Sequence, residues 1–315
     1  MSLPRRTLVA LLPVATALAA GLAGCGEAKP APEAEATASR LGTALAEIDG
    51  VTSSEARVHI PRRSPRARIV GNVTVRPDLD LAELTRVARA FRAALEAHQF
   101  PPYITEGRLT TSLDGHEFSW EMDLAAPGEL VGPTVETAYE ELDRGASSVQ
   151  LDRYGVRSSW ERMDDRALLA PVGRVRVGRG LTASDSAGTF TWVDVVVFPD
   201  QRIYPIPFTS LATPMIGIMR SIRLGFLDNR VSWQLSPRSE RIGGADDPLL
   251  RSTAARFLRD LLARPVAPEQ DVEFMPPWGV KLRVADTVTI TEWNNDATRA
   301  QSEAVVIGLL EELNR

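Results

Sequence analysis

The stretch Val73-Thr74-Val75-Arg76-Pro77-Asp78 decides the predicted fold, because it marks a change from strand to helix. Residues 68–75 alternate between apolar and polar, which is typical of a strand with one buried face. Downstream, apolar residues recur at helical spacing, at Leu81, Leu84, Val87, Phe91 and Leu95. This spacing predicts an amphipathic helix over 79–97, for which Asp78 or Asp80 can serve as the N-cap.

Predicted strands flank this helix on both sides. Residues 51–60 pair with 68–75 around an Arg/Pro loop, and residues 107–113 pair with 117–124 across Asp114-Gly115, a strong two-residue turn signal. A short helix is expected over 39–48. The resulting unit is helix, hairpin, helix, hairpin.

A second copy of this unit is predicted downstream. Val195-Val196-Val197-Phe198-Pro199-Asp200 matches 73–78, and Ser232-Trp233-Gln234-Leu235 matches Ser119-Trp120-Glu121-Met122 in the same order. The elements expected here are a helix over 134–143, strands over 174–177 and 192–198, an apolar helix over 214–227 and a strand over 230–235. We therefore expect 52–124 to superpose on 172–235.

The C-terminal part is expected to contain similar helices and strands, but it lacks the matching residues. It is expected to contain a helix over 249–262 that starts at Asp247-Pro248, a hairpin of 280–285 with 288–293, and a helix over 305–313 capped within 294–296. The predicted fold class is α+β, with antiparallel sheets, helices packed on one face, and internal duplication of the helix-hairpin-helix-hairpin unit.

The N-terminal residues have the three parts of a secretory signal: Arg5-Arg6, an apolar run over 8–20, and the small-residue end Leu22-Ala23-Gly24-Cys25. This end resembles the bacterial lipobox, and the resemblance covers residues 1–25 only. It implies that Cys25 carries diacylglycerol, becomes the first mature residue, and attaches the protein to the outer side of the cell membrane.

The predicted domain organisation follows from these signals. It consists of a signal peptide (1–24), a lipidated cysteine with a Pro/Ala/Glu tether (25–37), two α+β repeats (38–127 and 128–240) and a C-terminal α+β segment (241–315). A formal net charge of −5 argues against nucleic acid as a partner, because nucleic-acid binding normally requires a clustered basic face. Cys25 is the single cysteine, so no intrachain disulfide is possible.

Residue patterns that would carry catalysis are sparse. The histidines His59, His98 and His116 lack metal-ligand spacing, and no nucleophile elbow or phosphate-cradling glycine loop occurs. We expect no cofactor and no metal. Carboxylate pairs occur at Asp78/Asp80, Glu140/Glu141, Asp164/Asp165 and Asp246/Asp247, and they are interpreted as solvated turns and helix caps.

Two features are candidates for surface contacts. The arginines of the 62–68 loop, which are Arg62, Arg63, Arg66 and Arg68, could touch lipid headgroups or wall phosphates. Trp278, in the rigid turn Met275-Pro276-Pro277-Trp278-Gly279, is the tryptophan expected to be exposed. The other five lie in or beside predicted strands and are assigned to the core, with exposure on one sheet face as a platform for sugars, peptides or lipid as the alternative.

The sequence therefore predicts a non-catalytic, lipid-anchored extracytoplasmic protein of the cell envelope that binds or supports an envelope protein or a wall component. Two alternatives stay open. One is an extracytoplasmic hydrolase that uses scattered acidic residues. The other is a carrier of an apolar ligand, which needs a cavity under the apolar 214–227 helix.

Overall fold

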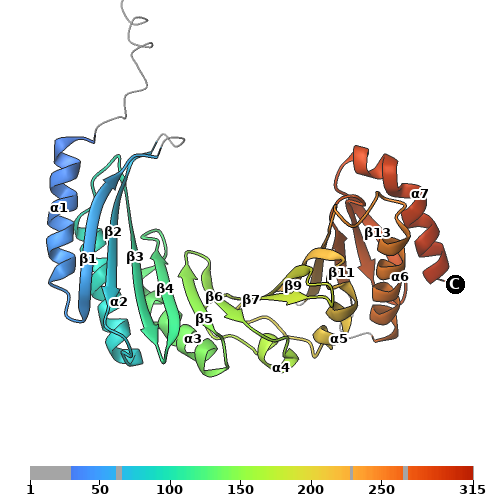
Figure 1. Ribbon diagram of the computed structural model, residues 1–315, viewed down its shortest axis with the longest axis horizontal. Coiled ribbons are helices and arrows are strands. Elements are labelled where there is room, and N and C mark those ends of the chain that lie inside the picture. Colours follow the sequence, from blue (N-terminus) through green and yellow to red (C-terminus); the bar gives the residue numbers. More distant parts are fainter. Residues whose placement is uncertain (1–29, 62–65, 228–229, 265–268, 315) are drawn as a thin grey trace, which may run out of the picture.

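The computed structural model describes residues 30–61, 66–227, 230–264 and 269–314 (Figure 1). Within these residues, thirteen strands form one sheet whose spatial order follows the chain. The strands are β1 (Val51–His59), β2 (Arg68–Val75), β3 (Ile104–Leu113), β4 (His116–Met122), β5 (Ser148–Asp152), β6 (Gly155–Trp160), β7 (Val177–Ser184), β8 (Phe190–Val197), β9 (Met219–Leu227), β10 (Arg230–Pro237), β11 (Gln270–Phe274), β12 (Val280–Val284) and β13 (Val288–Trp293).

Helices connect the strands. The described α-helices are α1 (Pro32–Ala46), α2 (Leu81–Ala97), α3 (Val131–Asp143), α4 (Asp165–Leu168), α5 (Phe208–Ala212), α6 (Pro248–Ala263) and α7 (Asp296–Leu313). Two short 3-10 turns, η1 (Gly128–Leu130) and η2 (Thr213–Met215), precede α3 and follow α5.

The sheet is mixed, with a regular alternation of pairing. Strands joined by a short turn pair antiparallel, as in β3 with β4 and β7 with β8. Strands separated by a helical connection pair parallel: β2 with β3, β4 with β5, β6 with β7, β8 with β9, and β10 with β11. A parallel neighbour requires a crossover, and α2 to α6 occupy these crossovers.

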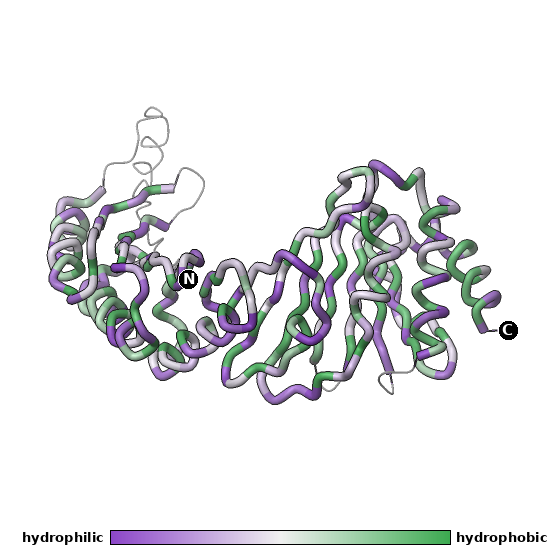
Figure 2. Tube along the Cα trace, turned by 60° about the horizontal axis from the view of Figure 1, so that its bottom comes forward, coloured by the Kyte–Doolittle hydropathy of each residue, from purple (hydrophilic) through white to green (hydrophobic). Residues whose placement is uncertain are grey.

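All the helices cover one face of the sheet and leave the other open. Figure 1 shows the sheet bending between β1 and β13, with the helices along its outer side. Along the strands, hydrophobic and hydrophilic segments alternate (Figure 2), as expected when only one face is buried. The open face therefore lines the concave side of the molecule.

The helices pack closely because the sheet has no side chain beneath them at two points. A β-carbon added at Gly107 would lie 2.5 Å from Cζ of Phe91 and 2.8 Å from Cδ1 of Leu95, both on α2. Gly71 faces Leu45 of α1 in the same way, at 2.9 Å. Farther along the sheet, aromatic side chains rather than glycines form the contact between helices and strands.

Trp233 of β10 is the centre of that aromatic contact. It stacks on Phe208 of α5, with ring centroids 5.8 Å apart, and meets Phe257 of α6 edge-on at 5.1 Å. All three rings are buried. Such aromatic pairs add stability beyond their buried area, so they join α5 and α6 to the sheet.

Several sequence expectations are confirmed. The helix expected over 79–97 is α2, and Asp80 caps it through a complete capping box with Glu83. The hairpin across Asp114-Gly115 is β3–β4, and the two C-terminal helices begin at Asp247 and Asn295 caps.

The predicted fold class is wrong in two respects. One continuous mixed sheet replaces separate antiparallel sheets. It also does not divide into two helix-hairpin-helix-hairpin copies, because strand pairing continues across both predicted repeat boundaries, from β4 to β5 and from β10 to β11. Asp78 and Asp200 do share a left-handed backbone, with φ of 57° and 58°, but as a local turn within one sheet.

Individual elements also differ from expectation. The apolar stretch expected as a helix over 214–227 is η2 followed by strand β9, and the strand expected over 174–177 begins only at Val177. Helix α1 starts at Pro32, so the second half of the predicted tether is helical, with Ala34 and Thr37 buried. Strand β11 was not expected from the sequence.

Candidate functional site

The candidate site lies on the open face of the sheet, which is rich in polar and charged residues. On each strand, alternate side chains point away from the helices. On the central strands, the residues that do so include Arg108, Glu117, Gln150, Asp152, Arg157, Asp194 and Arg223. A large exposed side chain of apolar character interrupts this polar surface at β8.

Trp192 is that side chain, and it is 49% exposed. It faces Gly180 on the neighbouring strand β7, where an added β-carbon would lie 2.8 Å from Cζ2 and 3.2 Å from Cη2 of the indole. The indole therefore lies against a strand position that carries no side chain. About half of the side chain is exposed to solvent.

Trp192 borders a cavity of about 280 Å³. The cavity is lined by Arg108, Glu117, Ser119, Ser148, Val149, Gln150, Arg157, Ser158, Ser159, Gly180, Trp192 and Asp194. These side chains supply donors, acceptors and both signs of charge around a single aromatic ring. Phe190, two residues earlier on β8, is 62% exposed but does not line the cavity.

Asp194 is the acidic residue of this cavity whose pKa is shifted by its surroundings. Burial raises the pKa of its carboxyl, and the nearby cations Arg223, Arg157 and Arg176 partly oppose this. Its Oδ2 lies 3.3 Å from Nε of Arg223. Asp194 is thus a partly buried acid in an ionic cluster that lines the site.

A second cavity, of about 710 Å³, continues the open face toward β2. Arg108 lines both cavities, so the two adjoin. Within the second cavity, Arg68 donates to both carboxylate oxygens of Glu106 at 3.0 Å. The two cavities form one long polar groove across β2 to β8.

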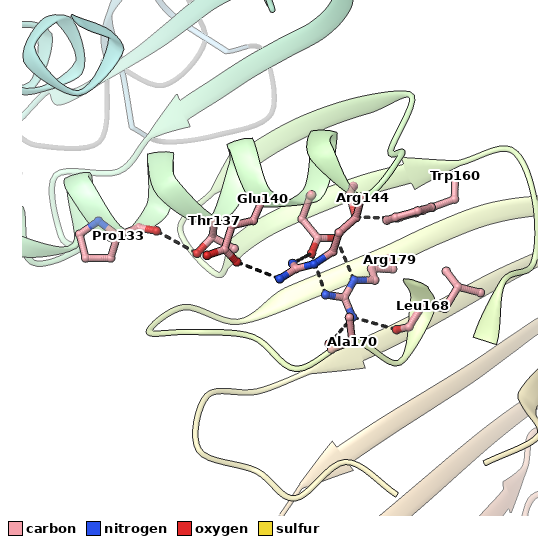
Figure 3. A network of polar contacts seen from close by, with 10 residues as sticks. Pro133, Thr137, Glu140, Arg144, Trp160, Leu168, Ala170 and Arg179 are labelled. Atoms are coloured by element: carbon pink, nitrogen blue, oxygen red, sulfur yellow. Dashed lines mark hydrogen bonds and ion pairs between the residues drawn. The ribbon is translucent and has the colours of Figure 1, made fainter. Parts of the chain in front are cut away.

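On the covered face, a buried ion pair fixes α3 to the middle of the sheet (Figure 3). Arg179 of β7 donates from Nε and Nη2 to the two oxygens of Glu141, at 2.8 and 2.7 Å, and both side chains are fully buried. Ser158 and Arg144 also donate to Glu141, each at 2.9 Å. Arg179 further donates to the carbonyls of Leu168 and Ala170.

This network is structural, because every oxygen of Glu141 is engaged and neither side chain reaches solvent. Its presence corrects the interpretation of the Glu140/Glu141 pair as solvated, since Glu141 is 0% exposed. For the other carboxylate pairs, Asp80, Asp164 and Asp247 are N-caps, as expected.

Of the predicted contact residues, the structure describes Arg66, Arg68 and Trp278. Cys25, Arg62 and Arg63 lie outside the described residues, Arg66 is exposed, and Arg68 is engaged with Glu106. The expected exposure of Trp278 is wrong, because its ring is fully buried and its Nε1 donates to the carbonyl of Ala245 at 2.7 Å. The ring packs on that of Phe274, with centroids 5.1 Å apart, and Ser302 of α7 donates to the backbone carbonyl of Trp278 at 3.0 Å.

The assignment of Trp192 to the core is wrong, because its side chain is 49% exposed, although the sequence contains a signal for this exposure. Along 190–197 the apolar residues Val193, Val195 and Val197 share one phase, whereas Trp192 shares the opposite phase with Asp194. A tryptophan in phase with an aspartate on a half-buried strand predicts exposure.

Metal and membrane-spanning features are not found in the described part of the chain. There, no three His, Cys, Asp or Glu side chains gather in a way that could hold a metal ion. None of the described helices has the length and apolar character that crossing a membrane requires. Comparison with protein families, curated proteins and solved structures found no match for this chain.

Proposed function

We propose that the protein is a non-catalytic binding protein of the bacterial cell envelope, attached to the membrane through lipid on Cys25, whose open groove holds a glycan chain. The observation that carries the proposal is Trp192, half-exposed against Gly180 and surrounded by polar side chains. The lipobox-like residues 22–25 support the proposed attachment to the membrane.

The chemistry of the groove suits a sugar better than an apolar ligand. A pyranose ring has a face of C–H groups and a rim of hydroxyls. The C–H face can pack on the exposed indole, because aromatic rings attract positively polarised edges. Glu117, Gln150 and Arg157 line the same cavity and can accept from and donate to the hydroxyls.

The shape of the groove suits a chain of several sugars. Two adjoining cavities of about 280 and 710 Å³ extend from β8 to β2 along the uncovered face. Binding sites of this size enclose most of a small ligand or several units of a long one. A wall glycan is the extended polar polymer that an extracytoplasmic, membrane-anchored protein meets.

Calorimetric titration with soluble hexasaccharides of β-1,4-linked N-acetylglucosamine and of β-1,4-linked glucose tests the proposal. We expect one of them to bind the wild type and Trp192→Ala to weaken that binding about 10-fold or more, because truncating a central aromatic contact costs ~2 kcal/mol. Phe190→Ala is the matched control, since Phe190 is exposed on the same strand but lies outside the cavity. Equal affinities for wild type and Trp192→Ala would refute the proposal.

A hydrolase is the second candidate, and Asp194 is the observation that favours it. A carboxyl whose pKa is raised by burial, in a cavity that also contains Glu117, has the character of a general acid. Release of reducing ends from the same hexasaccharides, abolished by Asp194→Asn, would establish hydrolysis and overturn the non-catalytic assignment.

A further inference from the structure

A third pocket, of about 260 Å³, opens beside the turn between β5 and β6. It is lined by Arg92, Trp120, Met122, Asp123, Ala126, Pro127, Leu130, Val131, Thr134, Asp152, Arg153, Tyr154, Gly155, Arg174, Val175, Arg176 and Pro199. Its wall is mainly apolar, and its charged residues are mostly arginines. Trp192 and Asp194 do not line it.

Arg176 is the central cation of this pocket. Its guanidinium lies over the rings of Phe198 and Tyr154, with distances of 5.4 and 6.0 Å to their centroids. Among the residues that the structure describes, no carboxylate oxygen lies within 4.0 Å of it, and its buried Nε has no hydrogen-bond partner. The side chain is half-buried.

The surroundings of Arg176 do not fully balance its positive charge. Burial lowers the pKa of Arg176, and the positive charges of Arg223 and Arg157 lower it further. Asp194 and Asp152 act in the opposite direction but more weakly than burial. Because an arginine side chain stays protonated in proteins, an anion that enters the pocket relieves this unfavourable state.

The other charged groups of the pocket have different environments. Arg92 is engaged with Glu96 at 2.7 Å, and Asp152 accepts from the backbone N–H of Tyr154 at 2.7 Å. Arg174, however, is exposed and has no ion pair with any described residue. Three arginines of the pocket, Arg153, Arg174 and Arg176, therefore have no carboxylate oxygen within 4.0 Å among the described residues, and Arg153 is engaged with the hydroxyl of Tyr154.

The apolar wall determines what such an anion must carry. Trp120, Met122, Val131 and Val175 are almost fully buried and line the pocket beside the arginines. A small inorganic anion would use only the arginines, whereas an apolar body next to the anionic group would also cover these side chains. Burial of that apolar surface adds to the binding free energy.

We propose that this pocket binds the phosphate monoester of a small amphiphile, with the phosphate at Arg176 and Arg174 and the apolar body against Trp120 and Val175. Arginine suits this role because its planar guanidinium can donate two parallel hydrogen bonds to two oxygens of one phosphate. The pocket adjoins the glycan groove, because Met122, Asp123, Asp152, Arg153 and Tyr154 line both. Arg174 and Arg176 themselves line neither cavity of the groove.

Calorimetric titration of the full folded chain with hexyl phosphate and with inorganic phosphate tests the proposal. We expect hexyl phosphate to bind at least about 10-fold more tightly than inorganic phosphate, because only the ester covers the apolar wall. Arg176→Gln should weaken hexyl phosphate binding by at least ~10-fold, and Arg174→Gln, at an exposed position, by ~3-fold. Arg256→Gln, an exposed arginine on α6 with the same charge change, should have no effect.

The following results would contradict the proposal. Undetectable binding of hexyl phosphate overturns it, and so does equal affinity for the two phosphates, which would indicate a site for free phosphate. Equal weakening by Arg176→Gln and Arg256→Gln would indicate a general charge effect. If Arg176→Gln fails to fold by thermal melting, Arg174→Gln alone decides, and unchanged affinity in that variant overturns the proposal. Hexasaccharide binding should persist in both variants, which separates this test from that of the glycan groove.

Discussion

At the scale of single residues, Glu141 and Arg179 illustrate how burial changes the role of a charge. Glu140 and Glu141 are adjacent on α3, yet Glu140 is partly exposed beside Arg144, whereas Glu141 is fully buried against Arg179. A buried ion pair contributes little by itself, but removing one partner leaves an uncompensated charge in the interior.

We therefore expect Glu141→Gln to lower the free energy of unfolding by about 3–5 kcal/mol, because the guanidinium of Arg179 would remain buried without its counter-ion. Glu140→Gln removes the same charge from the adjacent residue. It should lower the free energy of unfolding by less than ~1 kcal/mol, because exposed ion pairs contribute little. Urea denaturation of the two variants measures the difference. Similar losses in both would show that Arg179 does not depend on Glu141.

Asp194 should make stability depend on pH. Because burial raises its pKa in the folded state, the folded protein binds more protons than the unfolded chain at pH values above the ordinary pKa of aspartate, and ionisation of Asp194 opposes folding there. Arg223, Arg157 and Arg176 face this carboxyl and reduce the effect without reversing it. Lowering the pH from 7 toward the ordinary pKa of aspartate should therefore stabilise the wild type relative to Asp194→Asn. The check is denaturant unfolding at both values, and a difference that is constant or of opposite sign would contradict the assignment.

At the scale of elements, the distance between α2 and the sheet depends on glycine. Gly107→Ala would place a methyl group against Phe91, Leu95 and the carbonyl of Gly71. Gly225, on the open side of β9, has no atom within 4 Å of an added β-carbon. We expect Gly107→Ala to cost about 1–3 kcal/mol through overpacking. Gly225→Ala should be close to neutral or stabilising in thermal melts, and comparable losses in the two variants would argue against tight packing of α2.

The sequence predicted those elements whose signals are local. The spacing of Leu84, Phe91 and Leu95 predicted α2, and Asp114-Gly115 predicted the hairpin of β3 and β4, because helix period and turn chemistry depend on neighbouring residues. The apolar stretch over 214–227 was mistaken for a helix, although the buried residues Ile222, Leu224 and Phe226 alternate with period two. A short apolar run of this kind does not separate strand from buried helix by composition.

The parallel pairings were not predictable in this way. They join hairpins that are separated by a helix, and no local residue specifies which strand lies beside which. The same limit explains the candidate site. Trp192 and Gly180 lie twelve residues apart on neighbouring strands, and only the register that pairs Thr182 with Trp192 brings the indole against the glycine. The exposure of Trp192 could be predicted from its phase in the strand, but its contact with Gly180 could not.

At the scale of the whole molecule, the position of the concave groove relative to the membrane follows from the N-terminus. If Cys25 carries lipid, the folded body begins at α1, seven residues later. An extended chain covers at most ~3.6 Å per residue, so the anchor holds α1 within about 25 Å of the membrane. The protein would then contact wall polymer close to the membrane surface.

We expect Cys25→Ser to remove the protein from the membrane fraction of cells, because no other residue can accept the thioether-linked lipid of a lipobox. The variant should accumulate as a precursor or as a protein without lipid, which mass spectrometry of the N-terminal peptide identifies. Unchanged membrane association would contradict anchoring through Cys25. The folded part should be unaffected, so thermal melting of the purified body serves as the control.

The central claim is that a glycan packs on Trp192 in the open groove. The most direct measurement is the NMR signal of the Trp192 indole N–H, assigned by its absence in Trp192→Phe, during titration with the hexasaccharide that binds. Our account predicts that this signal shifts saturably while the indole signals of the buried Trp233 and Trp278 stay in place. Binding that leaves the Trp192 signal unmoved, or that shifts the buried indoles instead, would contradict the account.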